Sequence, residues 1–198
     1  HLNLTQKILI TTSALLALAI AAIAVVSTAQ SSRYLEDLAR TDLSHLSTSA
    51  YNICKINAEQ AKRKVASDLV SAQRLFAETG GATVGVFNGE MVLSGNGQNY
   101  VVNDDTKLVD DVTAKTGSAC TVFLKDGASA RRIATSVKKA DGSRAVGTYI
   151  SEEVYNAVFR DGRTFYGRAW VVDRWMVTAY EPIRDPSGEV IGSIFVGA

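Results

Sequence analysis

The sequence Arg132-Ile133-Ala134-Thr135 begins the series of short apolar segments that decides the fold of this chain. The series continues through Ala140-Asp141-Gly142-Ser143-Arg144, Tyr166-Gly167-Arg168-Ala169 and Tyr180-Glu181-Pro182-Ile183-Arg184, and closes on Gly188-Glu189-Val190-Ile191-Gly192-Ser193-Ile194-Phe195-Val196-Gly197. From Arg131 to Ala198 this pattern predicts a strand, an Asp-Gly turn, a second strand, a short helix and three closely linked strands.

The residues before this series also alternate between strand and helix signals. Asn88-Gly89 predicts a tight hairpin turn between two short strands, and Asp104-Asp105-Thr106 offers N-capping side chains to a helix that ends near Gly117. Ser151 is expected to cap the short helix, whose first turn holds Glu152 and Glu153. The predicted strands are 83–87, 91–93, 119–124, 131–137, 144–150, 165–172, 175–180 and 189–196.

This series of motifs resembles the single Cache domains of the Cache_3/Cache_2 type. These are PAS-like sensor modules that lie outside the membrane in bacterial chemotaxis receptors and sensor kinases. The resemblance covers most of the chain after its first apolar segment and is most specific from Arg132 onward. It implies an α+β fold, in which a long helix precedes a PAS-like antiparallel sheet with short inserted helices.

The N-terminus predicts a transmembrane anchor. Ile8 to Ser27 is an uncharged run of 20 residues, which is long enough to cross a bilayer as a helix. Lys7 precedes the run, and this weakly favours a cytoplasmic N-terminus. The alternative is a cleaved signal peptide, since Ser27-Thr28-Ala29 carries small residues, but the apolar run is longer than is usual for one. Either interpretation exports the rest of the chain, and the first places it on an inner membrane as a single-pass protein.

A long amphipathic helix is predicted to follow, since residues 30–79 contain neither proline nor glycine. Gly80-Gly81 is expected to end it. The domain boundaries are therefore expected at 1–29, 30–80 and 81–198. One stripe of the helix is apolar: Leu43, Leu46, Ala50, Ile53, Ala58, Ala61, Val65, Leu69, Ala72 and Phe76. We expect its second half to pack on the sheet and its first half to contact a partner helix, most simply from a second copy in a homodimer.

Composition argues against several classes of function. With 21 basic and 20 acidic residues, the chain lacks the positive charge typical of a nucleic-acid binder. The two histidines, His1 and His45, form no zinc spacing with the cysteines, and no nucleophile or nucleotide motif is present. The sequence therefore predicts a protein that is not an enzyme and that holds no metal or cofactor.

The two cysteines, Cys54 and Cys120, leave two interpretations open. In an exported protein they can form a disulfide, which would tie the long helix to the sheet. The alternative is two buried free thiols, because cysteine packs well as a small apolar residue.

The candidate ligand site lies on the predicted strands. Arg131 and Arg132 are neighbours on a strand, so their side chains point to opposite faces, and one can reach an internal pocket. The match to the family motif favours Arg132. A buried arginine needs a partner, and a ligand carboxylate would serve. Tyr166, Arg168 and Trp170 share one face of their strand and are expected near Tyr180. The predicted ligand-binding residues are Arg132, Thr135, Tyr166, Arg168, Trp170 and Tyr180.

Two functions compete at this point. The resemblance implies a ligand-sensing domain that binds a small organic anion, such as a carboxylate metabolite, for chemotaxis or another form of signal transduction. The alternative is a one-span accessory or scaffold subunit of a membrane assembly without a signalling output. An output region downstream of Ala198 would favour the first interpretation.

Overall fold

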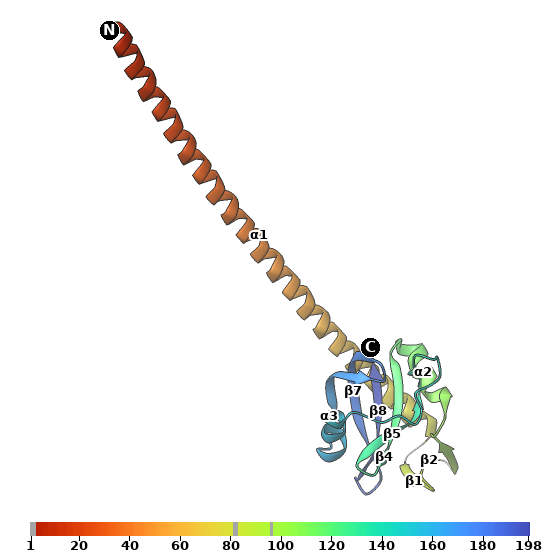
Figure 1. Cartoon of the computed structure of the whole chain (residues 1–198). Helices are drawn as coiled ribbons and strands as arrows, with labels where there is room; N and C mark the ends of the chain where they lie inside the picture. The colour runs from red at the N-terminus through yellow and green to blue at the C-terminus, as the bar shows by residue number, and fades with distance from the viewer. Residues whose placement is uncertain (1–2, 81–82, 96) are drawn as a thin grey trace. The chain divides into compact units, whose positions relative to one another are not determined.

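The computed structural model describes residues 3–80, 83–95 and 97–198 (Figure 1). The chain divides into two compact units, His1–Ile56 and Asn57–Ala198. The elements are α1 (Leu4–Gly80), β1 (Thr83–Phe87), β2 (Glu90–Gly95), β3 (Gln98–Val101), α2 (Thr106–Thr116), β4 (Ala119–Asp126), β5 (Ser129–Thr135), α3 (Glu152–Tyr155), the π-helix η1 (Asn156–Arg160), β6 (Phe165–Val171), β7 (Arg174–Arg184) and β8 (Val190–Gly197). The predicted α+β class, a long helix followed by antiparallel strands with short helices, is confirmed.

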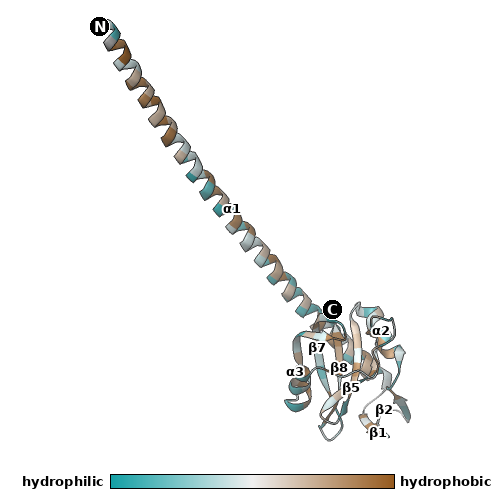
Figure 2. Ribbon diagram, viewed as in Figure 1, coloured by the Kyte–Doolittle hydropathy of each residue, from teal (hydrophilic) through white to brown (hydrophobic). Residues whose placement is uncertain are grey.

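The first unit consists of the N-terminal part of α1. Its apolar side chains are exposed, and Figure 2 shows that they are most frequent toward the N-terminus. Within the described residues, α1 is the one helix that is long and apolar enough to cross a membrane. The helix ends at Gly80, as the sequence predicts, while Gly81 lies outside the described residues.

In the second unit, residues 57–80 of α1 pack on the domain. Val65, Leu69 and Ala72 are buried there, which confirms the second half of the predicted apolar stripe. The Lys64 ammonium donates to the Thr116 carbonyl and to the Ser118 hydroxyl, at 3.0 and 2.7 Å, and lies 2.5 Å from the Asp68 carboxylate. This polar contact fixes α1 to the connection between α2 and β4.

The main sheet has five antiparallel strands in the order β5-β4-β8-β7-β6. β8 lies at its centre between β4 and β7, and all eight of its residues are buried. A strand that is buried on both faces needs a mainly apolar sequence, and the run from Val190 to Gly197, in which Ser193 is the one polar residue, supplies it.

Opposite faces of this sheet carry separate cores. On the α1 face, α1 and α2 cover alternate residues of the strands, among them Val122, Ala179, Ile194 and Val196. On the α3 face, α3, η1 and the segment 137–150 cover the intervening residues, among them Phe123, Ala169, Val171, Tyr180 and Phe195. Strand alternation assigns most side chains of the sheet to one of these two faces. A β-bulge in the pairing of β4 with β5 interrupts it, so the neighbours Ile133 and Ala134 both belong to the core on the α1 face.

A second, three-stranded sheet has the order β1-β2-β3. The predicted hairpin turn is confirmed, because Asn88 and Gly89 both take positive φ, at 52° and 80°. β3 was not predicted, since its residues Gln98–Val101 contain two polar side chains and follow a glycine-rich loop. It is held by backbone pairing with β2, and a strand of only four residues is too short to show an alternating pattern in the sequence.

The helix α2 follows the predicted caps. The Asp105 carboxylate accepts hydrogen bonds from the backbone N–H groups of Lys107 and Leu108, and Gly117 ends the helix in the left-handed conformation at φ 74°. Leu108, Val109 and Val112 form its buried side.

The strand predicted at 144–150 is wrong. This part of the chain forms only isolated bridges, Arg131 with Tyr149 and Lys138 with Arg144. Gly147 has a φ of 82°, which strands do not accommodate, so the segment pairs with the edge of β5 around Tyr149 without forming a regular strand. The short helix after Ser151 is present, but the Ser151 side chain makes no capping hydrogen bond.

Candidate functional site

The α3 face of the main sheet carries a buried arginine. Arg132 lies on β5 with 3% of its surface exposed, whereas Arg131 points outward to the Asp126 carboxylate, 3.8 Å away. The prediction that these neighbours point to opposite faces is therefore confirmed. The guanidinium carbon of Arg132 lies 4.9 Å from the centre of the Phe123 ring on β4.

The Arg132 guanidinium is only partly satisfied by protein groups. Its Nη1 donates to the Thr148 hydroxyl at 2.5 Å, while the buried Nε has no hydrogen-bond partner among the described residues. Within the same residues, no carboxylate forms an ion pair with Arg132. Burial disfavours the charged form, and it lowers the pKa of Arg132. A buried cation with a free N–H is poised to accept an anionic partner.

The segment 137–150 covers this guanidinium. The Arg132 backbone N–H donates to the Thr148 carbonyl, and the Gly147 N–H donates to the Arg132 carbonyl, at 2.8 and 2.9 Å. Arg144 holds the far end of the segment through a bidentate ion pair with Asp110 on α2, at 2.8 and 2.7 Å. Thr148 is a contact that the sequence analysis missed, because nothing in the sequence marks its hydroxyl as a partner of Arg132.

Tyr180 lies at the centre of an aromatic layer on the same face. Its ring centroid is 4.8 Å from that of Phe195, 5.9 Å from that of Phe165 and 6.0 Å from that of Phe123. Burial raises the pKa of Tyr180, and the positive charge of Arg132 opposes that rise. The Phe123 ring is the common neighbour of the Tyr180 phenol and the Arg132 guanidinium, so both groups lie in one site.

Thr135 lies on the same face, but protein groups occupy its hydroxyl. The hydroxyls of Thr135 and Thr121 are 2.5 Å apart, and the Thr135 oxygen also accepts from the Val137 N–H at 3.0 Å. Thr135 therefore joins β5 to β4 and fixes the start of the segment 137–150.

The remaining predicted residues lie elsewhere. Tyr166, Arg168 and Trp170 share one face of β6, as alternation predicts, but it is the α1 face. The register pairs Phe165 with Tyr180 and Tyr166 with Ala179, so Tyr180 points to the opposite side. The expectation that these three residues meet Tyr180 is wrong. They lie on an edge strand with about half of the Tyr166 and Trp170 surfaces exposed, and Arg168 stacks 5.3 Å from the Trp175 ring.

A polar hollow of about 500 Å³ lies between η1 and the start of β6, next to the aromatic layer around Tyr180. Phe165 lines it and also packs against Tyr180, so the two sites share one wall. The hollow is polar because Glu153, Asp161, Arg163 and Tyr166 contribute to its lining. The buried Asn156 Oδ1, on the π-helix, has no hydrogen-bond partner among the described residues. Asn156 was not predicted, since nothing in the sequence marks a π-helix.

Both cysteines are free in the structure, so the interpretation with a disulfide is wrong. Cys120 is buried, and burial raises the pKa of its thiol to about 12. Cys54 is exposed on α1 and does not pack in a core. Within the described part of the chain, no group of three or more His, Cys, Asp or Glu side chains could hold a metal ion.

Taken together, the long N-terminal helix, the antiparallel sheet and the buried, incompletely paired guanidinium define a sensor-type ligand-binding module. The family comparison agrees, because residues 28–198 match the Cache 3/Cache 2 fusion domain. The chain belongs to this family, whose members are extracytoplasmic ligand-sensing domains and typically not enzymes. Comparison with curated proteins gives no significant match.

Proposed function

We propose that this domain senses a small organic anion, most simply a carboxylate, which binds to Arg132 on the α3 face of the sheet. The observation that carries the proposal is the buried Arg132 Nε, which lacks a hydrogen-bond partner among the described residues. A buried charge without a counter-ion is costly, and a bound carboxylate would supply both the charge and the missing acceptor.

Selectivity for a small ligand follows from the surroundings of Arg132. Phe123 and Tyr180 form an apolar wall beside the guanidinium, and this favours a compact ligand with an apolar body and one anionic group. Of the six predicted residues, Arg132 and Tyr180 keep the strongest case for contacting such a ligand. Tyr166 lines only the neighbouring hollow.

Ligand binding would shift the segment 137–150, which covers the Arg132 guanidinium. Thr148 now accepts from Arg132 Nη1, and the backbone of 147–148 pairs with Arg132. A bidentate carboxylate that accepts from the free Nε and from Nη2 would draw the guanidinium toward itself and so strain the bond from Nη1 to the Thr148 hydroxyl. The ligand would thereby shift the segment 137–150, which is the kind of local change that a sensor passes on.

The position of the domain in the cell is part of the proposal. We place α1 residues 8–27 in the inner membrane and the sheet domain in the periplasm or outside the cell, as the family and the apolar helix indicate. A chemotaxis or related signal-transduction receptor would use this arrangement as a homodimer. The boundaries 1–29, 30–80 and 81–198 then correspond to the anchor, the connecting helix and the sensor.

A thermal-shift screen of organic acids, amino acids and inorganic anions against the full chain tests the proposal. A ligand that binds only the folded state stabilises it by about 2.7 kcal/mol at a hundredfold excess over Kd. We expect a carboxylate to raise the melting temperature, Arg132→Ala to abolish the shift, and Arg131→Ala to preserve it. A screen without any active anion, or a shift that survives Arg132→Ala, contradicts the proposal.

A further inference from the structure

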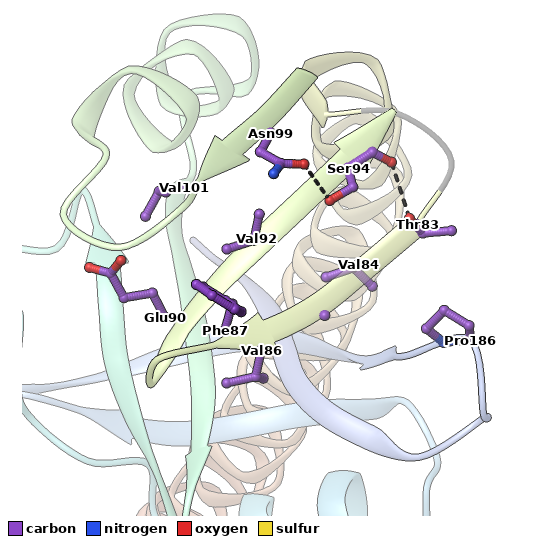
Figure 3. A pocket seen from close by; sticks show the side chains of 11 residues that line it. Thr83, Val84, Val86, Phe87, Glu90, Val92, Ser94, Asn99, Val101 and Pro186 are labelled. Atoms are coloured by element: carbon purple, nitrogen blue, oxygen red, sulfur yellow. Dashed lines mark hydrogen bonds between the residues drawn. The ribbon is translucent and has the colours of Figure 1, made fainter. Parts of the chain in front are cut away.

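A separate hollow of about 450 Å³ lies on the outer face of the three-stranded sheet (Figure 3). Its volume falls within the range of small-molecule sites, about 300–1,000 Å³. None of its lining residues belongs to the Arg132 group or to the polar hollow beside η1. The sensor function proposed above therefore leaves this hollow unexplained.

Gly85 creates the floor of the hollow. The register aligns Gly85 with Val92 and Val92 with Val101, so these residues lie side by side across the three strands. A Cβ placed on Gly85 would meet no atom within 4 Å. The missing side chain leaves open space beside Val92 and Val101, and this space suits an apolar group of a ligand.

One end of the hollow carries the chemistry that recognises an organic cation. Phe87 and Glu90 are direct cross-strand partners at the hairpin turn, and Figure 3 shows both at this end. Phe87 is 70% exposed as a residue. Glu90 is the only ionisable residue in the lining, and among the described residues its carboxylate forms no ion pair. An aromatic face next to a carboxylate attracts an ammonium group and disfavours an anion.

The opposite end is polar but neutral. Thr83, Ser94 and Asn99 are aligned across the three strands, and the Ser94 hydroxyl donates to the Asn99 side-chain oxygen at 2.8 Å (Figure 3). The hollow is therefore amphipathic along its length, with its single charge at the turn end.

We propose that this hollow is a second ligand site, which binds a small organic ammonium ion with an apolar body. The ammonium would lie between Phe87 and Glu90, and the apolar body would lie over Gly85, Val92 and Val101. The site has the opposite charge preference to Arg132, so this domain would bind a cation and an anion at separate places.

Titration calorimetry on the full chain in uncharged detergent tests the site. The probes are butyltrimethylammonium, the neutral 1-pentanol and the anion pentanoate. We expect only the ammonium probe to bind through this hollow. Glu90→Gln should weaken its binding about fivefold. Gly85→Val should abolish it, because the new side chain fills the open floor and valine suits a strand.

Glu78→Gln is the matched control, since Glu78 is an exposed acid on α1 that does not line the hollow, and we expect it to leave the binding of the ammonium probe unchanged. Absence of binding would overturn the proposal, as would binding that survives both Glu90→Gln and Gly85→Val. Equal binding of the ammonium probe and 1-pentanol would also overturn it, since the hollow would then be an apolar surface for a protein partner. The result for carboxylates at Arg132 is independent of each of these outcomes.

Discussion

Arg132 illustrates the conflict between stability and function in a single residue. Its guanidinium is buried over Phe123, and one N–H lacks a partner among the described residues. In a domain selected for stability alone, an apolar side chain of similar length would fill this position at lower cost. Local departures from the rules of packing are expected where a protein binds a ligand.

We therefore predict that Arg132→Met stabilises the protein when no ligand is added. Replacing a buried, incompletely paired charge with an apolar side chain should raise the free energy of unfolding by about 1 kcal/mol or more. Chemical denaturation followed by circular dichroism measures the change, and Arg131→Met serves as the control at a half-buried position. A clear loss of stability in Arg132→Met would mean that Phe123 and Thr148 already satisfy the guanidinium.

At the scale of the element, β8 is the strand on which the domain depends. It pairs with β4 and β7, and its residues contribute to both cores. Gly192 lies where the backbone of β4 approaches closely, since a Cβ there would be 2.5 Å from the Phe123 carbonyl oxygen. A backbone atom cannot move aside as a flexible side chain can.

Gly192→Ala should consequently lower the free energy of unfolding by about 1–3 kcal/mol, which is typical of overpacking in a core. Gly85→Ala is the matched control in β1, because the added methyl group meets open space and should change stability little. Urea denaturation of both variants tests the pair. Equal stabilities would show that β4 can move away from β8 without cost.

At the scale of the whole molecule, the first unit exposes an apolar stripe. Leu43, Leu46 and Ile53 are each more than half exposed on α1. Burying apolar area contributes roughly 25 cal/mol per Å². An anchor in the membrane would also raise the effective concentration of neighbouring copies. Both effects favour a parallel homodimer through this part of the helix.

Cysteine cross-linking in membranes tests the homodimer. We expect single cysteines at Leu38 or Leu46, in a Cys54→Ser and Cys120→Ala background, to form disulfide-linked dimers efficiently. Thr48→Cys is the control, because it lies about 200° around the helix from Leu46 and about 140° from Leu43 and Ile53, and should cross-link poorly. Capture of a different polypeptide in place of a second copy would contradict the homodimer and favour the accessory-subunit interpretation.

The sequence by itself determined the fold class, the family and most of the elements. Caps and turns carry local signals, and so the ends of α2 and the Asn88-Gly89 hairpin were predicted correctly. Alternation also showed that Arg131 and Arg132 face opposite sides, and the family motif indicated which of them is buried.

Only the tertiary structure decided which face of the sheet each of these side chains occupies. Tyr166, Arg168 and Trp170 share a face by alternation, but the register of β6 with β7 puts that face opposite Tyr180. Residues 144–150 have the composition of a strand, yet the positive φ of Gly147 limits them to isolated bridges beside β5. A periodicity describes one segment alone, whereas the face that a side chain occupies depends on how that segment pairs with distant ones.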